Sequence, residues 1–302
     1  MSKCIGCGVK LQNTDENKNG YVLDINHKCC VRCFKIKNYN NHDIKGSTLN
    51  NIELLSKINK KNCFTFFLCD FLSLSKKNID LYLAIENKKV FVITKMDIIP
   101  KNIELNKLKD TIKKVYGLDN VIFFSKESGY EKNNILSLIE SNDKVIFAGP
   151  SNSGKSSLIN YLFDKAITVS NHKNTTLDFI SIDYEGYIIL DAPGFNDDNI
   201  VDKIDFKKDI KPKTLQLKTG FVLEICNYQL YFEKDANLTL FLPNNIEFKT
   251  YKKKENFTNE LEIIGNSDVI INNIGFIYLK DNKMYINDLT NIEVRKSIIG
   301  VK

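Results

Sequence analysis

Two pairs of cysteines near the N-terminus have the spacing of metal ligands. The pairs are Cys4-Ile-Gly-Cys7 and Cys30-Val-Arg-Cys33. Each C-x-x-C turn can place two sulfurs on one metal ion, and two turns complete the tetrahedral shell of zinc. Residues 1–40 are too few and too polar to build a core without such a metal. Free or buried thiols are the weaker alternative, and a pairing of Cys29 with Cys33 stays open.

A glycine-rich stretch has the spacing of a phosphate-binding P-loop. It reads Gly149-Pro-Ser-Asn-Ser-Gly154-Lys155-Ser156, after the apolar run Val145–Ala148. We expect backbone N–H groups to surround the phosphates, Lys155 to contact the terminal phosphates and Ser156 to hold Mg²⁺. The expected contacts are Asn152, Ser153, Gly154, Lys155, Ser156 and Ser157. A glycine-rich turn without a ligand is the alternative.

Downstream, Asp191-Ala-Pro-Gly194 closes the apolar run Tyr187–Leu190. At that distance a P-loop protein needs a second carboxylate near Mg²⁺ and a glycine beside the γ-phosphate. We expect Asp191 to bind the magnesium through water and the Gly194 amide to contact the γ-phosphate. Between the two motifs, a polar stretch suited to a mobile switch contains Thr175 and Thr176. We favour Thr176 as a further Mg²⁺ ligand, with a plain loop or helix-cap role as the alternative.

A third motif, Thr94-Lys95-Met96-Asp97, fits the [N/T]-K-x-D pattern that reads guanine. A carboxylate at Asp97 accepts hydrogen bonds from both N1–H and the 2-amino group of guanine, and adenine offers no such pair of donors. The tetrapeptide also arises easily by chance in a chain so rich in lysine and asparagine.

The position of this motif in the chain is better evidence for guanine binding than its residue pattern. It ends the apolar run Val90–Ile93, and about thirty residues later the run Val121–Phe124 ends in Ser125-Lys126, where a second base-contacting loop belongs. The expected nucleotide contacts in these two loops are Thr94, Lys95, Asp97, Ser125 and Lys126.

Short apolar runs alternate with amphipathic helices between about residues 50 and 200, a pattern typical of a mostly parallel α/β sheet. Strands are expected at Cys63–Cys69, Val90–Ile93, Val121–Phe124, Val145–Ala148 and Tyr187–Leu190, and helices at Asn102–Tyr116, Asn133–Ser141 and Lys155–Phe163. Beyond residue 212 strands and turns alternate, with Asp281-Asn282 as an expected hairpin turn.

The order of the motifs is unusual for a GTPase. Asp97 precedes Gly149 by 52 residues, whereas ordinary GTPases place the P-loop first and the guanine readers last. The motifs therefore predict a circularly permuted P-loop GTPase domain at residues 46–205. A zinc-binding module at 1–45 and a β-rich C-terminal domain at 206–302 would flank it.

Composition and charge exclude several classes of protein. The 302 residues are 43% hydrophobic, enough for a core, and no apolar run reaches the roughly 18 residues of a membrane span. The start of the chain does not resemble a leader, and the cysteine usage favours a reducing compartment, so we expect a cytoplasmic protein. Residues 1–62 hold 11 basic and 5 acidic residues, which suits a polyanionic partner, or simply a solvated lysine-rich surface.

Taken together, the motifs resemble the YqeH-type circularly permuted GTPases over essentially the whole chain. The resemblance rests on the cysteine pairs, Thr94-Lys-x-Asp97 with Ile99-Pro100-Lys101, the P-loop, Thr175-Thr176-Leu177, Asp191-x-Pro-Gly194, and weaker matches at Lys211-Pro212 and Ser267-Asp268-Val269. Departures are Thr94, where the family usually has asparagine, Lys126, where it has a small residue, and a missing glycine before Thr175. The resemblance implies a role in assembly of the small ribosomal subunit, with ribosomal RNA as a partner.

The residues that catalyse hydrolysis are harder to identify from the motifs. Phe195 follows Gly194, so the glutamine that orients water in Ras-like enzymes is absent and slow intrinsic hydrolysis is expected. The resemblance to GTPases with a hydrophobic residue there implies that Asn152 helps to bind a potassium ion beside the phosphates, where its charge replaces an arginine finger. A loop-shaping role for Asn152 is the alternative. The residues expected to serve catalysis are Lys155, Thr176, Gly194 and Asn152.

Two functions from different classes fit the sequence. The first is a GTP-hydrolysing assembly factor whose nucleotide state controls binding to RNA and the small ribosomal subunit. The second is a zinc-containing, RNA-binding scaffold with a structural or nearly inactive guanine nucleotide site. The oligomeric state does not follow from the sequence.

Overall fold

The computed structural model describes residues 4, 9–14, 20–22, 30, 51–163, 179–195, 210–252, 257, 259–272 and 274–299. The chain forms two compact units, one of residues 1–67, 84–89 and 133–196 and the other of residues 68–83, 90–132 and 197–302. Cys7, Cys33, Thr175 and Thr176 lie outside the described residues.

Six strands form a mostly parallel sheet in the order β3-β2-β1-β4-β6-β5. Their bounds are β1 Phe64–Asp70, β2 Lys89–Thr94, β3 Val121–Phe123, β4 Lys144–Ala148, β5 Ile180–Tyr184 and β6 Tyr187–Asp191. β1 pairs with β4, β2 with β3 and β4 with β6 in parallel, whereas β5 runs antiparallel to β6. Strands buried on both faces consist of nearly continuous apolar residues, which is why five of the six were predicted.

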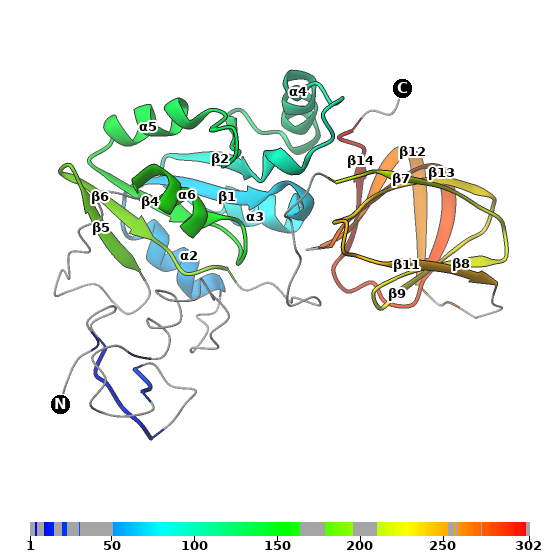
Figure 1. Ribbon diagram of the computed structural model, residues 1–302, viewed down its shortest axis with the longest axis horizontal. Coiled ribbons are helices and arrows are strands. Elements are labelled where there is room, and N and C mark those ends of the chain that lie inside the picture. The colour runs from blue at the N-terminus through cyan, green and yellow to red at the C-terminus, as the bar shows by residue number, and fades with distance from the viewer. Residues whose placement is uncertain are drawn as a thin grey trace. The chain divides into compact units, whose positions relative to one another are not determined.

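Five α-helices accompany this sheet in the described part of the chain (Figure 1). They are α2 Asn51–Asn59, α3 Lys76–Leu83, α4 Leu105–Tyr116, α5 Lys132–Glu140 and α6 Lys155–Phe163. The three predicted helices are confirmed, although α4 begins three residues later than expected. α2 and α3 were not predicted, although both bury side chains at helical spacing. None of the helices that the structure describes is long and apolar enough to cross a membrane.

The strand order agrees with a permuted chain. β4, which leads into the P-loop, lies between β1 and β6 in the sheet although it is the fourth strand in sequence. β2, which carries Thr94 at its end, is reached earlier in the chain. The guanine-reading motif therefore precedes the P-loop in sequence while both follow strands of one sheet.

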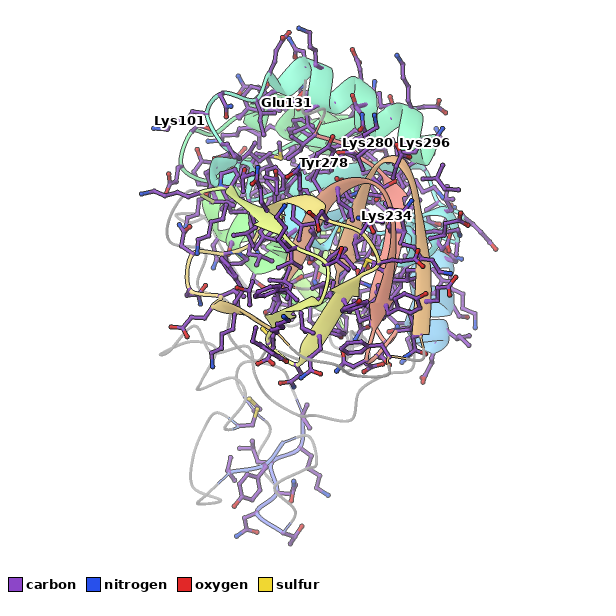
Figure 2. The ribbon with its side chains drawn as sticks, turned by 90° about the vertical axis from the view of Figure 1, so that its right-hand side faces the viewer. Lys101, Glu131, Lys234, Tyr278, Lys280 and Lys296 are labelled. Atoms are coloured by element: carbon purple, nitrogen blue, oxygen red, sulfur yellow. The ribbon has the colours of Figure 1, made fainter. Side chains whose placement is uncertain are left out.

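The C-terminal residues form a second, antiparallel sheet of eight strands, as the sequence predicted. The strands are β7 Lys213–Leu217, β8 Phe221–Ile225, β9 Tyr228–Phe232, β10 Ala236–Phe241, β11 Phe248–Lys252, β12 Asn259–Ile271, β13 Gly275–Ile286 and β14 Ile292–Lys296. Their inward side chains, such as Leu223, Leu230 and Met284, form one hydrophobic core. Lys280 of β13 and Lys296 of β14 are exposed (Figure 2).

The predicted hairpin turn at Asp281-Asn282 is wrong. β13 continues through both residues, and the chain reverses between Ile271 and Gly275 instead. Asp281 has a positive φ of 34° and lies beside a bulge in β12, where its Oδ1 accepts a hydrogen bond from the Gly265 N–H at 2.6 Å. Turn-forming residues at this point therefore serve a bulge rather than a turn.

A buried arginine joins the β-rich sheet to the segment after β1. Arg295 Nε donates to Asp268 Oδ2 at 3.0 Å, and its Nη1 donates to the Leu74 carbonyl and to the Tyr116 hydroxyl. The guanidinium also lies 4.9 Å from the ring centroid of Phe276. All four contacts are made within the second compact unit.

A second contact strengthens the same junction. The Glu293 carboxylate of β14 accepts the Lys76 N–H at 2.7 Å, at the first residue of α3. A carboxylate at this position satisfies an N–H group that has no partner within the helix, and it complements the helix dipole. Phe71 and Phe276 pack edge to face nearby, with centroids 5.9 Å apart.

Candidate functional site

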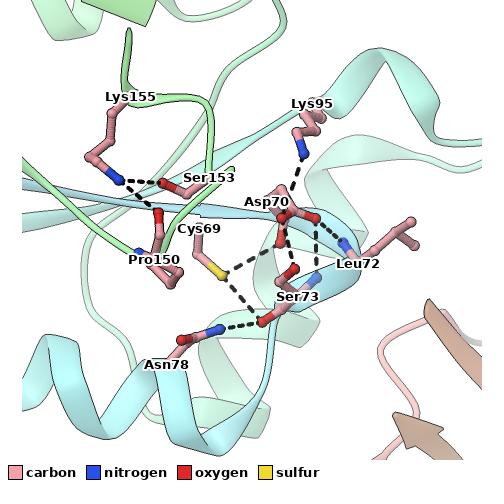
Figure 3. Close-up of polar contacts among 9 residues, drawn as sticks. All are labelled: Cys69, Asp70, Leu72, Ser73, Asn78, Lys95, Pro150, Ser153 and Lys155. Atoms are coloured by element: carbon pink, nitrogen blue, oxygen red, sulfur yellow. Dashed lines mark hydrogen bonds and ion pairs between the residues drawn. The ribbon is translucent and has the colours of Figure 1, made fainter. Parts of the chain in front are cut away.

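The P-loop folds around the side chain of Lys155. Its Nζ donates to the carbonyls of Gly149 at 2.9 Å and Pro150 at 2.7 Å and lies 3.5 Å from Ser153 Oγ (Figure 3). Burial lowers the pKa of Lys155 to about 8, although the charge of Asp191 opposes this shift. An ammonium group that is buried against neutral oxygens favours the arrival of an anion, because a phosphate would supply the missing negative charge.

The loop leads directly into α6, which begins at Lys155 and places Ser156 and Ser157 in its first turn. The first N–H groups of a helix have no partner within it, so this end suits a phosphate. Asn152 is exposed and has a left-handed backbone with φ of 62°. Asparagine tolerates this conformation well, which fits a loop-shaping role. The potassium role stays a prediction.

The Asp191–Gly194 loop contacts the P-loop directly. Asp191 is the last residue of β6, which runs parallel to β4. A Cβ atom on Gly194 would lie 2.5 Å from Ser151 Oγ and 3.0 Å from the Ser151 N, so only glycine permits this approach. The two loops are further joined by hydrogen bonds from Phe195 N to Gly149 O (3.1 Å) and from Ser151 N to Phe195 O (3.2 Å).

Phe195 itself is part of the core. Its side chain is buried, with its ring 6.0 Å from that of Phe67. A buried phenyl ring has no polar atom and cannot orient a water molecule. The sequence showed the absence of glutamine here, but not that the backbone of Phe195 holds the P-loop.

The guanine-reading motif and the second base-contacting loop meet at the ends of β2 and β3. Ser125 Oγ donates to Asp97 Oδ1 at 3.1 Å, and Met96 N donates to Phe124 O at 3.2 Å. Thr94 and Ser125 are buried, whereas Lys126 is exposed. The parallel pairing of β2 with β3 brings the two loops together and aligns the Asp97 carboxylate.

One residue of this region was not predicted. Asp70, at the end of β1, is buried and lies 3.7 Å from the Nζ of Lys95. The sequence carried a signal for it, a single carboxylate at the end of an otherwise apolar run. Its partner, 25 positions away, could not be identified from that signal.

Two of the four predicted zinc ligands lie within the described residues. Cys4 and Cys30 are both buried, and the Cys30 N–H donates to Cys4 Sγ at 3.2 Å. They share a small apolar cluster with Leu11 and Val22. Cys7 and Cys33 fall outside the description, and the described residues contain no group of three or more His, Cys, Asp or Glu side chains that could hold a metal.

Comparisons with known proteins agree with these motifs. Residues 69–200 match the profile of the RsgA GTPase family, and residues 144–289 match that of a family described as 50S ribosome-binding GTPase. Each match covers less than half of the chain. No curated protein shows significant similarity to it.

Among solved structures, the chain is similar to YjeQ from Thermotoga maritima, with 21% identity and a TM-score of 0.34. This similarity covers 44% of the chain and 48% of the YjeQ chain, so the chain spans about half the length of that relative. Both matched profiles are described as GTPases, and both matched ranges include the P-loop and Asp191. With the strand order described above, they support a circularly permuted GTPase domain.

Proposed function

We propose that this protein is a GTP-hydrolysing assembly factor whose nucleotide state controls its binding to the small ribosomal subunit and its RNA. The observation that carries the nucleotide part is the bond between Ser125 and Asp97, which aligns a carboxylate at the end of β2. A carboxylate fixed in this way can accept both donors on the Watson–Crick edge of guanine. We propose that the protein acts in the cytoplasm.

The phosphates would bind at the P-loop. Lys155 would move from the carbonyls of Gly149 and Pro150 to the terminal phosphates, which replaces neutral partners by charged ones. Ser156 and Asp191 would hold Mg²⁺, with Thr176 as a third ligand, and the ion would neutralise charge that develops on the phosphates. The Gly194 amide would contact the γ-phosphate.

Slow intrinsic turnover is part of this proposal. The phenyl ring of Phe195 is buried, so water must be oriented by another group. A potassium ion near Asn152, or a ribosomal partner that orders the segment around Thr176, would supply the missing positioning and charge.

The partner is proposed from the motif resemblance and from charge. The N-terminal segment carries the excess of basic residues, and the β-rich part has exposed lysines at Lys234, Lys280 and Lys296 (Figure 2). Exposed lysines attract phosphate backbones without sequence preference. One matched family is described as 50S ribosome-binding, so the test must include both subunits.

The decisive experiment is co-sedimentation of the full chain with purified small and large ribosomal subunits, in GDP and in a non-hydrolysable GTP analogue. We expect binding to the small subunit that is stronger with the analogue. Equal binding in both nucleotides would favour the alternative, an RNA-binding scaffold with a structural nucleotide site. Preference for the large subunit would contradict the proposed partner.

Guanine specificity can be tested separately. Asp97→Asn should shift the preference from guanine to xanthine nucleotides, because an amide can donate to the 2-oxo group of xanthine. Ser125→Ala is the matched control, since it removes the supporting hydroxyl and keeps the carboxylate. Equal affinity of the wild type for ATP and GTP would refute the GTPase proposal.

We also propose one structural zinc ion bound by Cys4, Cys7, Cys30 and Cys33. The proximity of Cys4 and Cys30 supports it, and so does the N–H···S bond between them. Zinc binding worth on the order of 10 kcal/mol would make folding of this segment depend on metal. Metal analysis should find one equivalent, and Cys30→Ser should lose it. Full retention of zinc by Cys30→Ser would contradict the ligand set, and Cys29→Ser is the matched control.

A further inference from the structure

A buried carboxylate closes the carboxyl end of β1. Asp70 Oδ1 accepts hydrogen bonds from the Leu72 N–H at 3.0 Å and the Ser73 N–H at 3.2 Å. Asp70 Oδ2 accepts the Ser73 hydroxyl at 2.7 Å and lies 3.7 Å from Lys95 Nζ (Figure 3). The side chains of Asp70 and Lys95 are 5% and 20% exposed, so the ion pair is largely shielded from water.

The hydrogen bonds alone do not require a charge at this position. An asparagine oxygen can accept the two backbone N–H groups, and the asparagine NH₂ can donate to the Ser73 hydroxyl, which accepts as well as donates. A buried carboxylate costs free energy unless a cation compensates it. Lys95 supplies this cation, and it is the second residue of the guanine-reading motif.

Lys95 holds a backbone conformation that needs support. Its φ of 59° is left-handed, which is uncommon for a residue with a long side chain and costs free energy. It stands two residues before Asp97, at the start of the turn Met96–Ile98.

The side-chain contact between Lys95 and Asp70 is an ion pair rather than a hydrogen bond, because the two atoms are 3.7 Å apart. The contact therefore orients the ammonium group without using one of its N–H donors.

We propose that Asp70 is a positioning residue for nucleotide binding, which holds Lys95 and thereby the turn that presents Asp97. This inference rests on the proposed function. Lys95 is too flexible to keep one orientation by itself, since its four rotatable bonds lose up to about 2 kcal/mol of entropy when they are fixed. Asp70 fixes the lysine before the nucleotide arrives, so binding need not order it.

The test is a pair of matched variants assayed for GDP affinity and for stability. Asp70→Asn keeps the acceptor for Leu72 and Ser73 but removes the charge that faces Lys95. We expect its affinity for GDP to fall at least about tenfold, because the lysine must then be ordered as the nucleotide binds. Ser73→Ala removes the 2.7 Å bond and keeps the carboxylate, so it should bind GDP as the wild type does.

A double-variant cycle separates positioning from a structural role. In a Lys95→Met background, Asp70→Asn should cause no further loss of GDP affinity, because its effect acts through the lysine. Inosine diphosphate lacks the 2-amino group read by Asp97. Asp70→Asn releases the turn that presents Asp97, so it should weaken the binding of GDP more than that of IDP.

The outcomes are distinct. A wild type that fails to bind GDP would contradict the proposed function. A wild type that binds GDP, with an Asp70→Asn variant of equal affinity, would overturn only the role of Asp70. Losses that add in the double variant would likewise show that Asp70 acts independently of Lys95.

Discussion

Two buried cations of this protein stand in opposite surroundings. Lys155 in the P-loop contacts two carbonyls and a hydroxyl, and burial lowers its pKa to about 8. Arg295 in β14 contacts the Asp268 carboxylate, a carbonyl, a hydroxyl and an aromatic face. Burial opposes its charge too, yet its interactions with Tyr116 and Asp268 raise its pKa.

The difference in partners distinguishes a lysine that can bind a ligand from an arginine that stabilises the fold. A buried cation with a carboxylate partner has its charge balanced within the fold, so removing it leaves an uncompensated partner. The contacts of Lys155 are neutral oxygens, and the charge of Asp191 only partly offsets its burial, so this cation gains free energy when an anion binds. Burial is nearly the same for both, with 8% of Lys155 and 7% of Arg295 exposed, so the partners decide the role.

The largest effect is expected for Arg295→Met. The substitution leaves the Asp268 carboxylate buried without its cation, which costs about 3–5 kcal/mol in the free energy of unfolding. Urea unfolding of the full chain should show this loss, and the double variant Arg295→Met/Asp268→Asn should recover part of it. A loss near 1 kcal/mol, about the value of an exposed pair, would remove the contrast with Lys155.

Lys155→Met should weaken nucleotide binding without lowering the stability of the fold, the opposite of Arg295→Met. We expect GTP affinity to fall at least about 100-fold, close to 3 kcal/mol, because the phosphates lose their main side-chain cation. The free energy of unfolding of the nucleotide-free protein should stay the same or rise, since an incompletely balanced charge is removed. Fluorescent GTP binding and urea unfolding measure the two effects. A variant that loses stability as Arg295→Met does would show that Lys155 also serves the fold.

The pH dependence sharpens the comparison. The pKa of Lys155 is lowered in the folded state from 10.5 to about 8, so the cost of its charge is fully present below pH 8 and disappears as the pH rises toward 10.5. Between pH 7.5 and 9, the nucleotide-free wild type should gain about 1 kcal/mol relative to Lys155→Met. Arg295 stays charged throughout, so Arg295→Met should show no such change relative to the wild type.

The smallest effect concerns Asn152, which lies three residues before Lys155. If a potassium ion adds to the charge of the lysine, GTP hydrolysis should be a few-fold faster in potassium than in sodium at equal ionic strength. Asn152→Gly should abolish this difference, because glycine keeps the left-handed backbone and removes only the side chain. Equal rates in both salts, with and without small subunits, would leave Asn152 a loop residue.

The sequence alone determined the local chemistry and most of the parallel sheet. β1, β2, β3, β4 and β6 are continuous apolar runs because both faces are covered, and the P-loop is recognisable because its chemistry depends on consecutive backbone groups. The strand β5, Ile180–Tyr184, was missed because polar residues alternate with its apolar ones. The turn at Asp281-Asn282 was misread because the same residue types suit turns and bulges.

Only the tertiary structure decided which side chains act together. Asp70 and Lys95 meet because β1 and β2 end beside one another, and Arg295 reaches the carbonyl of Leu74 across 221 positions of sequence. The sequence around a buried charge does not identify its partner, since the stabilising interaction depends on distance in space and not along the chain. That is why Lys155 could be assigned from its neighbours in sequence, while the roles of Asp70 and Arg295 emerged only from the fold.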